Sequence, residues 1–313
     1  MRFAMFDDEG VARAGVVEGE DLHPLRAGVT VLDLIAWGAL REAGETARRG
    51  RPVALDSVRL LPPLLPPTIR DFVTFESHVE GITRRFGHEV APEWYEAPTF
   101  YFTNPYAVTG PHDDVPIPPG CQVFDFELEV AAVVGRAGRD LTPEEAREHI
   151  VGYTILNDWS ARDLQAREMR VNLGPAKGKD SATTLGPWLV TVDELEAHRD
   201  PDGFLDLTMT VARNGVEVGR DTLANMAWTF EEMLAYASRG TWVGPGDVLG
   251  SGTCGSGCLA ELWGRLGAQE PPPLRPGDVV TMTVDGLGTI SNAVVPGGEP
   301  VAVPPARKKP IPR

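Results

Sequence analysis

Three carboxylates in two nearby segments have the chemistry of a site for a hard metal ion. Glu127 and Glu129 alternate along the segment FDFELEV, so both side chains project from one face of an extended strand. If the other face is core, the two anions repel each other unless a cation or a shared proton compensates. Asp158 follows the apolar run GYTIL, so it can approach both from a neighbouring strand. Three carboxylates with open positions suit Mg²⁺, Mn²⁺ or Ca²⁺.

Other interpretations of these acids stay open at this point. The face that carries Glu127 and Glu129 also fits a solvated acidic strand. The same acids would serve a non-catalytic protein that binds a divalent cation or a carboxylate. Zinc is not favoured, because the six histidines form no HxH or HExxH spacing.

A cation and an amide follow Asp158 at helical spacing. If the chain turns helical from Asp158, Arg162 at i+4 and Gln165 at i+7 lie on the same face. That face would present a metal ligand, a cation and an amide donor to one ligand, while Asp163 points elsewhere and caps or forms an ion pair. The alternative is a surface helix start with an Asp–Arg pair, which stabilises a helix by about a few tenths of a kcal/mol.

Two glycine-rich segments follow. GPAKGKDS resembles a phosphate-binding loop, but it has one residue too few and Asp180 where a hydroxyl is required, so it does not predict nucleotide binding. Lys179 in this loop is expected to meet an anionic ligand. GSGTCGSGC predicts a backbone that approaches a ligand closely, with Thr253 as a donor.

His78 is a further candidate functional residue, but the sequence pattern around it is less specific. The segment FESHVEGITRRFG has apolar residues at helical spacing, and His78 lies at the edge of that stripe. A lone histidine there is usually a surface residue or a core residue with its hydrogen bonds satisfied. The stripe consists of Phe75, Val79, Ile82 and Phe86.

The elements around these residues predict a mixed, largely β (α+β) fold. RFAMF and VARAGVVEG form two strands around the turn DDEG, and a helix follows with Thr30 as its cap. Prolines between residues 60 and 68 mark a boundary. Beyond it, short strands are broken by turn residues, and two PGD turns each lead into a strand. The helices expected there are one that begins with the capping box of Thr142 and Glu145, and another over 221–238.

Composition excludes several function classes. The 313 residues are 42% hydrophobic, enough to fill a core, and no apolar run of membrane-spanning length occurs. The formal charge of -16 argues against nucleic acid, whose phosphates attract clustered Lys and Arg. Asp7 and Asp8 stand where a secretory signal would be apolar, and the three cysteines form no paired CxxC. We therefore expect a cytoplasmic protein with no membrane partner.

Five motifs in order, from about Ile69 to Val295, resemble the fumarylacetoacetate hydrolase family, and most closely its fumarylacetoacetase and acylpyruvate-type C–C hydrolases. The motifs are FELEV, NDWSARDLQ, GPAKGKDSATTLGPW, SGT at Ser251 to Thr253, and DGLGTISNAVV. The resemblance implies Glu127, Glu129 and Asp158 as metal ligands and Asp71 as a further one. It also implies a catalytic histidine, His78.

The resemblance assigns the remaining site residues as well. Glu261 would orient the catalytic histidine, although its distance from SGT is shorter than in the family. Three residues match those that hold the substrate and the developing oxyanion, and a fourth matches a contact to a substrate carboxylate. These are Arg162, Gln165 and Lys179, and then Thr253. The family's lid region departs from its pattern here, with Val73 in place of a tyrosine and Tyr101 as a candidate ligand contact, so the substrate stays open.

The resemblance implies a β-roll catalytic domain over 66–300, a small N-terminal β/α domain over 1–65 and a flexible tail over 301–313, in a homodimer. The implied activity is metal-dependent hydrolysis of a C–C bond in a small 1,3-dicarbonyl acid, such as a fumarylacetoacetate-like or acylpyruvate-like substrate. It would serve aromatic or 2-oxo acid catabolism. The alternative is an isomerase, tautomerase or decarboxylase of 2-oxo dicarboxylic acids on the same metal site.

Overall fold

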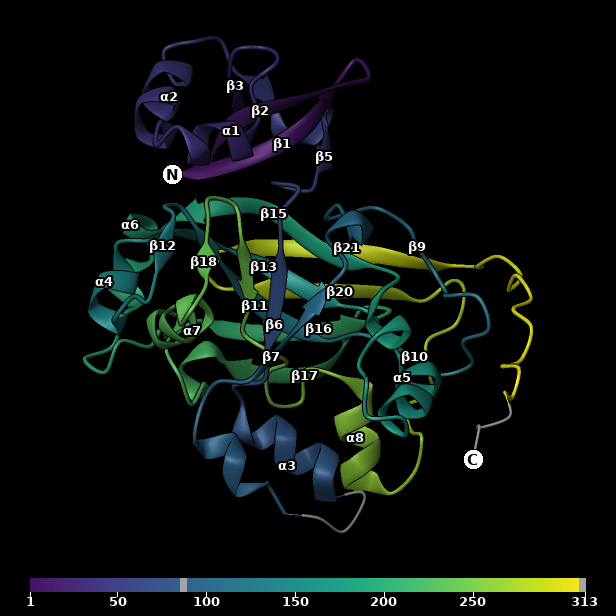
Figure 1. Ribbon diagram of the computed structural model, residues 1–313. Coiled ribbons are helices and arrows are strands. Elements are labelled where there is room, and N and C mark those ends of the chain that lie inside the picture. Colours follow the sequence, from purple (N-terminus) through teal and green to yellow (C-terminus); the bar gives the residue numbers. More distant parts are fainter. Residues whose placement is uncertain (85–88, 310–313) are drawn as a thin grey trace.

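The N-terminal segment forms a small β/α unit, which Figure 1 shows above the rest of the molecule. The computed structural model describes residues 1–84 and 89–309; Phe86, which the sequence places in an apolar stripe, lies outside the described residues. The elements of the unit are β1 (Arg2–Asp8), β2 (Val11–Glu18), β3 (Asp21–Pro24), α1 (Val31–Ala36), α2 (Leu40–Ala47), β4 (Val53–Ala54) and β5 (Arg59–Leu61). The predicted hairpin around DDEG is confirmed.

The predicted single helix after Thr30 was wrong, because two helices occur. Thr30 caps α1 as expected and forms a capping box with Asp33. The chain then breaks at Gly38, whose φ of +65° lies in the left-handed region, and α2 begins two residues later. A glycine in this conformation is a common way for a helix to end, and its sequence signal was overlooked.

The strands of the N-terminal unit continue into the large sheet of the molecule. The strand order is β4-β3-β2-β1-β15-β13-β11-β19-β6-β7, with β5 beside β1 and β8 beside β15. Arg2 and Phe3 of β1 pair with Val190 and Leu189 of β15. The additional strands are β6 (Ile69–Phe72), β7 (Phe100–Thr103), β8 (Val108–Thr109), β11 (Leu128–Val134), β13 (Ile150–Asp158), β15 (Thr183–Thr191) and β19 (Val248–Gly250). The domain division at residue 65 stays a prediction.

A second sheet has the order β17-β16-β20-β21-β9, and two short ribbons join β10 to β14 and β12 to β18. Its strands are β9 (Val115–Pro116), β16 (Thr208–Arg213), β17 (Val216–Thr222), β20 (Val279–Val284) and β21 (Gly288–Val295). The ribbons consist of β10 (Phe124–Asp125), β14 (Ser160–Ala161), β12 (Gly138–Arg139) and β18 (Trp242–Val243). The predicted mixed, largely β fold is confirmed.

The remaining helices lie around the ends and sides of these sheets. They are α3 (Glu76–Arg84), α4 (Pro143–Arg147), α5 (Arg162–Met169), α6 (Val192–Leu195), α7 (Phe230–Ser238) and α8 (Leu259–Leu266). In Figure 1, α3 and α8 lie below the sheets, on the side away from the N-terminal unit, and α5 lies at the lower right beside the sheets. Short 3₁₀ turns occur over Leu55–Ser57, Pro92–Tyr95, Pro105–Ala107, Lys177–Lys179, Glu196–His198 and Leu223–Asn225.

Local signals for helix starts and turns were mostly correct. Thr142 caps α4 through the expected capping box. The two PGD turns lead into β19 and β20. The helix expected over 221–238 begins only at Phe230, because Thr229 forms a capping box with Glu232 and the preceding residues belong to β17 and a 3₁₀ turn.

β11 explains how one strand serves two hydrophobic cores. All seven of its residues are buried, and successive side chains point to opposite faces. Val130 and Ala132 pack in the core that includes residues of the second sheet, whereas Ala131 and Val133 pack in the core shared with the N-terminal unit. Burial on both faces holds this strand firmly, and Glu129, one of the predicted metal ligands, lies near its start.

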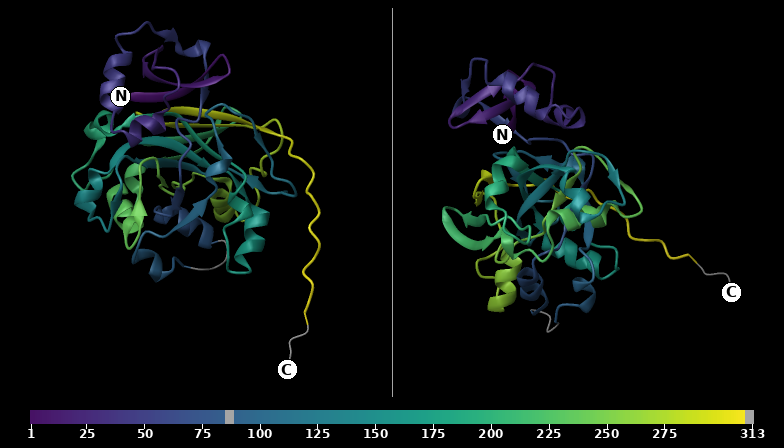
Figure 2. Two further views of the ribbon diagram at one scale, coloured as in Figure 1. Left: turned by 45° about the horizontal axis from the view of Figure 1, so that its top comes forward. Right: turned by 90° about the vertical axis from the view of Figure 1, so that its left-hand side faces the viewer.

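The C-terminal segment leaves the body of the protein, as both views in Figure 2 show. Residues 301–309 form no helix or strand and are exposed, and 310–313 lie outside the described residues. The flexibility predicted for 301–313 stays a prediction. Among the described residues, no helix has both the length and the apolar character needed to cross a bilayer.

Candidate active site

The ends of three strands bring three predicted metal ligands together. Asp71 lies in β6, Glu129 near the start of β11 and Asp158 at the end of β13. One oxygen of each lies within 4.8 Å of the others, and all three side chains are buried. Gly250 of β19 passes beside them: a Cβ atom there would lie 2.7 Å from Asp71 Oδ1 and 3.0 Å from Glu129 Oε2. Glycine at this position leaves the space in which the carboxylates converge.

Each of the three acids has one buried oxygen without a hydrogen-bond partner in the part of the chain that the structure describes. Asp71 Oδ1, Glu129 Oε1 and Asp158 Oδ1 accept no hydrogen bond from the described residues. Burial, with repulsion from Asp158, raises the pKa of Asp71 to about 8. Burial, with repulsion from Asp71, raises the pKa of Glu129 well above its usual range. A divalent cation with oxygen ligands would remove both penalties, so these residues fit Mg²⁺, Mn²⁺ or Ca²⁺.

This cluster predicts an unusual pH dependence for protein treated with a chelator. We expect its free energy of unfolding to fall as the pH rises from about 5 to about 8. Unfolded carboxyls have pKa values near 4, whereas that of Asp71 is about 8 in the folded protein and that of Glu129 is also raised. In this window the folded state holds protons that the unfolded state has released, so stability decreases with pH.

Melting temperatures measured in EDTA across this window test the expectation. Saturating Mg²⁺ should remove the decrease, because the ionised acids then have a cation to bind. A melting temperature in EDTA that stays level or rises between about pH 5 and pH 8 would contradict the account.

Glu127, the fourth predicted ligand, has a different environment, and its role as a metal ligand stays a prediction. Its Oε1 lies 2.7 Å from Arg162 Nη2, and its Oε2 accepts a hydrogen bond from Lys179 Nζ at 2.5 Å. Lys179 Nζ also lies 2.5 Å from Asp158 Oδ2, so one ammonium bridges the two carboxylates. Burial alone would raise the pKa of Glu127, but Arg162 and Lys179 hold it well below its usual range. The interpretation as a solvated acidic strand face was wrong.

The helical spacing proposed from Asp158 was also wrong. Asp158 is the last residue of β13, and α5 begins at Arg162. Arg162 instead reaches the site through its ion pairs with Glu127 and Asp125. Its Nη1 donates a hydrogen bond to Gln165 Oε1 at 3.2 Å, so the arginine and the glutamine do lie side by side.

Tyr101 of β7 connects two of the clustered acids. Its hydroxyl lies 2.8 Å from Asp71 Oδ2 and 2.5 Å from Asp158 Oδ2. Burial and the neighbouring carboxylates raise the pKa of Tyr101 well above its usual range, so the phenol keeps its proton. The structure thus places this residue against the carboxylates that would hold the metal.

His78 and Glu261 meet across two helices. His78 Nδ1 of α3 lies 3.3 Å from Glu261 Oε2 of α8. Gly81 allows the close approach, since a Cβ atom there would lie 2.4 Å from Glu261 Cγ. The same glutamate accepts a hydrogen bond from Ser256 N at 2.8 Å and forms an ion pair with Arg265. Several contacts therefore fix the carboxylate beside the imidazole.

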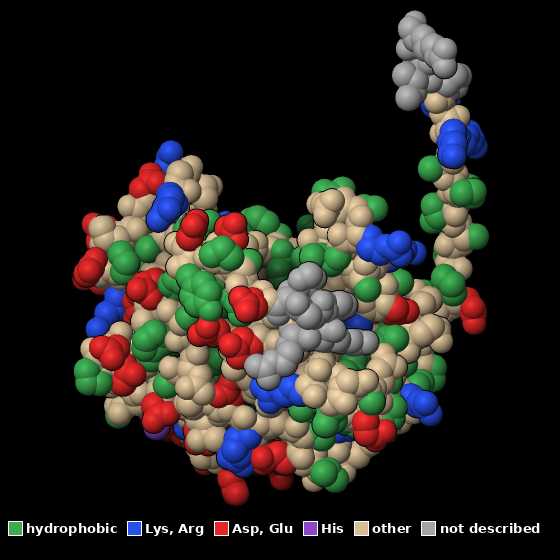
Figure 3. All heavy atoms as spheres, turned by 90° about the horizontal axis from the view of Figure 1, so that it is seen from below, with side chains coloured by type: hydrophobic (Ala, Val, Ile, Leu, Met, Phe, Trp, Pro, Cys, Tyr) green, Lys and Arg blue, Asp and Glu red, His purple; other side chains and the backbone are tan. Residues whose placement is uncertain are grey.

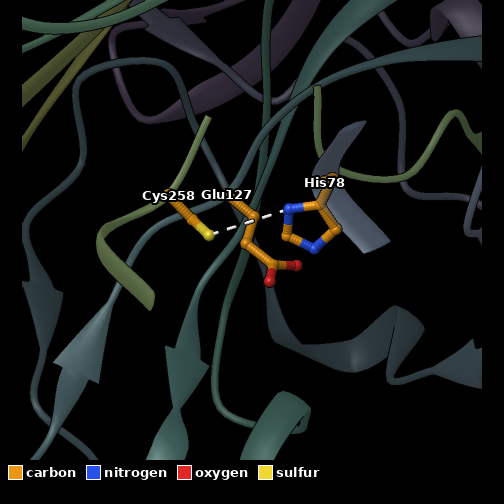
Figure 4. Close-up of side chains that lie close together, drawn as sticks. All are labelled: His78, Glu127 and Cys258. Carbon is orange, nitrogen blue, oxygen red and sulfur yellow. Dashed lines mark hydrogen bonds between the residues drawn. The ribbon is translucent and has the colours of Figure 1, made fainter. Parts of the chain in front are cut away.

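A buried thiol joins this pair and was not predicted. Cys258 Sγ lies 3.9 Å from His78 Nδ1. Figure 4 shows Cys258, His78 and Glu127 converging from three separate segments, and one ligand atom of each lies within 4.8 Å of the others. Burial raises the pKa of the Cys258 thiol well above its usual range, so it contributes no charge.

One pocket of about 810 Å³ joins these groups. Its lining includes most of the predicted site residues, although not Asp158 and Glu261. The predicted residues that line it are Asp71, His78, Tyr101, Glu127, Glu129, Arg162, Gln165, Lys179 and Thr253. A single pocket with convergent polar groups of this volume is typical of a small-molecule active site.

Asp125 belongs to the same period-two pattern as Glu127 and Glu129 but went unpredicted. It is fully buried, and its Oδ2 accepts hydrogen bonds from Arg162 Nε at 2.9 Å and Nη2 at 2.8 Å. The backbone N–H groups of Leu259 and Ala260 donate to its two oxygens, each at 2.9 Å. Asp125 therefore links Arg162 to the start of α8, the helix that contains Glu261.

Asp125→Ala is expected to lower the free energy of unfolding by about 3 kcal/mol. The substitution leaves three buried N–H groups, those of Phe126, Leu259 and Ala260, without this acceptor and removes one of the two anions paired with Arg162. Urea unfolding measures the loss. Asp125→Asn, which keeps the shape and one acceptor oxygen, should lose less. If Asp125→Ala were as stable as the unchanged protein, Asp125 would not stabilise the contact between Arg162 and α8.

Comparisons with known proteins identify the family of this chain. Residues 68–295 match the family described as fumarylacetoacetate (FAA) hydrolase C-terminal, and residues 1–63 match Rv2993c-like, N-terminal. The mitochondrial oxaloacetate tautomerase of Xenopus laevis is 36% identical over 191 residues, which are 60% of this chain and 55% of that protein. The chain thus spans about half the length of that relative. Fumarylacetoacetase of Arabidopsis thaliana is 31% identical over 305 residues, covering 77% of this chain and 72% of that protein.

Solved structures give the same result. A fumarylacetoacetate hydrolase from Exiguobacterium antarcticum has a TM-score of 0.75 and 29% identity, covering 95% of this chain and 99% of that chain. Maleylpyruvate hydrolase from Sphingobium sp. SYK-6, solved with manganese(II) and pyruvate, shares the fold at a TM-score of 0.72 and 24% identity, covering 95% and 100%. The relatives named here are enzymes, hydrolases and a tautomerase. This chain belongs to the fumarylacetoacetate hydrolase family.

Proposed function

We propose that this protein is a divalent-metal-dependent hydrolase that cleaves a C–C bond in a 1,3-dicarbonyl acid of the fumarylacetoacetate or acylpyruvate type. The observation that carries the proposal is the joint placement of His78, supported by Glu261, and the carboxylate cluster at one pocket. Hydrolysis needs an activated water, which a supported imidazole provides. A metal-stabilised enolisation alone does not need that pair.

Each residue has a part in the reaction. With Nδ1–H donated to Glu261, His78 has Nε2 free to take a proton from water. The water oxygen forms a bond to the acyl carbonyl carbon, and cations at Arg162 and Lys179, with the amide of Gln165, stabilise the oxyanion. A divalent ion held by Asp71, Glu129 and Asp158 would supply a Lewis acid for the two substrate oxygens.

The remaining steps balance without another reactant. The bond between the acyl carbon and the methylene carbon breaks, and its electron pair stays on the methylene carbon of the 2-oxo acid. Protonation of that carbon gives pyruvate or its homologue, and the acyl group leaves as a carboxylic acid. Thr253 and Tyr101 line the pocket at its polar end and would hold the 2-oxo acid portion.

A tautomerase, isomerase or decarboxylase of 2-oxo dicarboxylic acids is the second candidate. The 36% identity to an oxaloacetate tautomerase favours it, and these reactions use the same metal-stabilised enolate chemistry. The distinguishing residue pair is His78 with Glu261, which only hydrolysis requires as a water-activating base.

Turnover of a substrate panel tests the proposed function. Acylpyruvates and fumarylacetoacetate-like diketo acids lose their ultraviolet enol absorbance on cleavage, and each carboxylic acid product can be quantified. We expect turnover with Mg²⁺ or Mn²⁺ and none with excess chelator. Loss of oxaloacetate enol absorbance without any cleaved diketo acid would instead support the tautomerase. The homodimer, the cytoplasmic location and the catabolic role stay predictions.

A further inference from the structure

The pocket continues beyond the carboxylates along helix α5. Arg162, Gln165, Ala166 and Met169 all line it. They stand at i, i+3, i+4 and i+7, which is one face of a helix. At a rise of about 1.5 Å per residue, Met169 lies about 10 Å along the helix from Arg162. The pocket therefore has a polar end, where the chemistry is proposed, and a second part about two helical turns away.

This second part, here called the far chamber, has apolar walls from three helices. Ala166 and Met169 of α5 line it together with Ile82 of α3 and Trp263 of α8. Val123 and Ala260 also line the pocket, but they lie nearer Arg162: Val123 O accepts a hydrogen bond from Arg162 N at 2.8 Å, and Ala260 N donates to Asp125 at 2.9 Å. An apolar substrate group would leave water for this surface.

Cations for a second substrate carboxylate are scarce among the described residues of the lining. Arg162 is already paired with Asp125 and Glu127, and Lys179 bridges Glu127 to a further acid. Arg170 is the remaining cation, and its side chain is exposed at the end of α5. An exposed ion pair with solvent on one side contributes little to binding.

The electrostatic field around the pocket also disfavours a second negative charge on the substrate. The chain has a formal charge of -16. Figure 3 shows acidic side chains on the face of the molecule that lies below the sheets in Figure 1, mainly on its left side, with Lys and Arg side chains among them. Asp163 adds a carboxylate to the pocket lining itself, already accepting a hydrogen bond from Gln122 N at 2.9 Å. A dianionic substrate would be repelled more strongly than a monoanionic one.

We propose that the substrate is a 2-oxo acid with an uncharged, apolar acyl group that occupies the far chamber, rather than a dicarboxylate. This rests on the proposed function, because the acyl group is the part released by hydrolysis. The products are then pyruvate or its homologue and an apolar monocarboxylic acid, formed by the bond changes described above. Met169 and Trp263 contact the far end of the acyl chain.

Matched pairs of substrates test the chamber directly. Butanoylpyruvate and succinylpyruvate have acyl groups of equal length that differ in a terminal methyl or carboxylate, and crotonylpyruvate and fumarylpyruvate form a second pair. We expect kcat/KM to favour the methyl member of each pair by at least about tenfold. Lengthening the alkyl chain from acetyl to hexanoyl should raise kcat/KM by about fourfold per methylene until the chamber is filled. A preference for the carboxylate members would overturn the proposal.

A charge placed in the chamber should reverse the preference. Ala166→Arg adds a cation to the wall of the far chamber, about one helical turn nearer Arg162 than Arg170 is, and because Ala166 is exposed the fold is expected to survive. We expect it to lower kcat/KM for hexanoylpyruvate at least tenfold and to raise it for succinylpyruvate. Ala36→Arg adds the same charge to an exposed end of α1 and should leave both values unchanged. Equal effects of the two substitutions on the substrate preference would overturn the proposal.

Binding separates this proposal from the proposed function. With Mg²⁺ present, calorimetry compares 2-oxohexanoate with 2-oxoadipate, which have the same length and differ at the far end. We expect 2-oxohexanoate to bind at least tenfold more tightly, and Ala166→Arg to remove the difference. If 2-oxohexanoate bound more tightly but no acylpyruvate were turned over, the proposed hydrolysis would be rejected and the apolar preference of the far chamber would be supported. Equal or tighter binding of 2-oxoadipate would reject the chamber even if acylpyruvates are cleaved.

Discussion

Glu129→Gln is expected to raise the melting temperature of the protein in EDTA while abolishing Mg²⁺-dependent turnover. Glu129 is fully buried, and its Oε1 accepts no hydrogen bond from the described residues. Glutamine is neutral without taking up a proton, so the metal-free fold no longer bears the free-energy cost of holding a buried acid beside Asp71 and Asp158. The glutamine oxygen can still accept the hydrogen bond from Gly252 N, which lies 2.9 Å from Glu129 Oε2, so the local structure should persist.

The same substitution removes one of three ligands for the cation. At a Mg²⁺ concentration of 100 times Kd, the unchanged protein should gain about 2.7 kcal/mol of stability, and the variant should gain almost none. Loss of the Lewis acid should lower kcat by on the order of 10³-fold, because metal ions supply several kcal/mol of transition-state stabilisation. Melting curves with and without Mg²⁺, calorimetric titration and turnover of an acylpyruvate measure the three effects.

Glu231→Gln provides the matched control. Glu231 is also a buried glutamate, but it pairs with Arg199 at 2.9 Å and does not line the pocket. Its replacement should lower the melting temperature in EDTA and in Mg²⁺ alike, since it leaves Arg199 without that partner. If Glu129→Gln behaved in the same way, or bound Mg²⁺ with unchanged affinity, the carboxylate cluster would not be the metal site.

Short-range patterns predicted the parts of the site that one strand or one turn decides. The alternation in FDFELEV placed Glu127 and Glu129 on one side of the chain, with Phe126 and Leu128 fully buried on the other. The capping box at Thr142 was visible because all of its members lie within four residues. In each case the interacting residues are neighbours in sequence, so one periodicity describes them.

Long-range contacts decided what short-range patterns could not. Asp158 stays in β13 rather than starting a helix because Asn157 and Asp158 pair with Thr184 and Thr183 of β15. Those partners lie about 25 residues further along the chain, and their ladder outweighs the local helix signal. The glutamate beside His78 is 183 residues away. Only family resemblance pointed to it, because no periodicity connects α3 with α8.

The contacts of Lys179 also could not be predicted from short-range sequence patterns. The glycine loop around it indicated an anionic ligand, and the structure supplies anions from the protein itself, Glu127 and Asp158. The far chamber likewise has no sequence signature. Ala166 and Met169 are exposed positions of α5 and Trp263 is a buried position of α8, and only their meeting at one pocket gives them a common role.

His78→Gln is expected to separate hydrolysis from the chemistry that the metal supports alone. Replacing the general base should lower kcat for acylpyruvate cleavage by about 10²- to 10⁴-fold. Tautomerisation of an enol 2-oxo acid should persist, because it needs the cation and not an activated water. Mg²⁺ affinity should also persist, since the imidazole does not belong to the cluster of Asp71, Glu129 and Asp158.

Glu261→Gln and His112→Gln complete this test. Glu261 is proposed to act through His78, so its replacement should lower kcat less, by about tenfold, and leave KM nearly unchanged. His112 is exposed and does not line the pocket, so His112→Gln should have no effect. A fully active His78→Gln would remove the proposed base. Because the carboxylate cluster would be intact, such an enzyme would have to be assigned to tautomerisation or decarboxylation, and the three measurements together therefore decide which reaction the pocket performs.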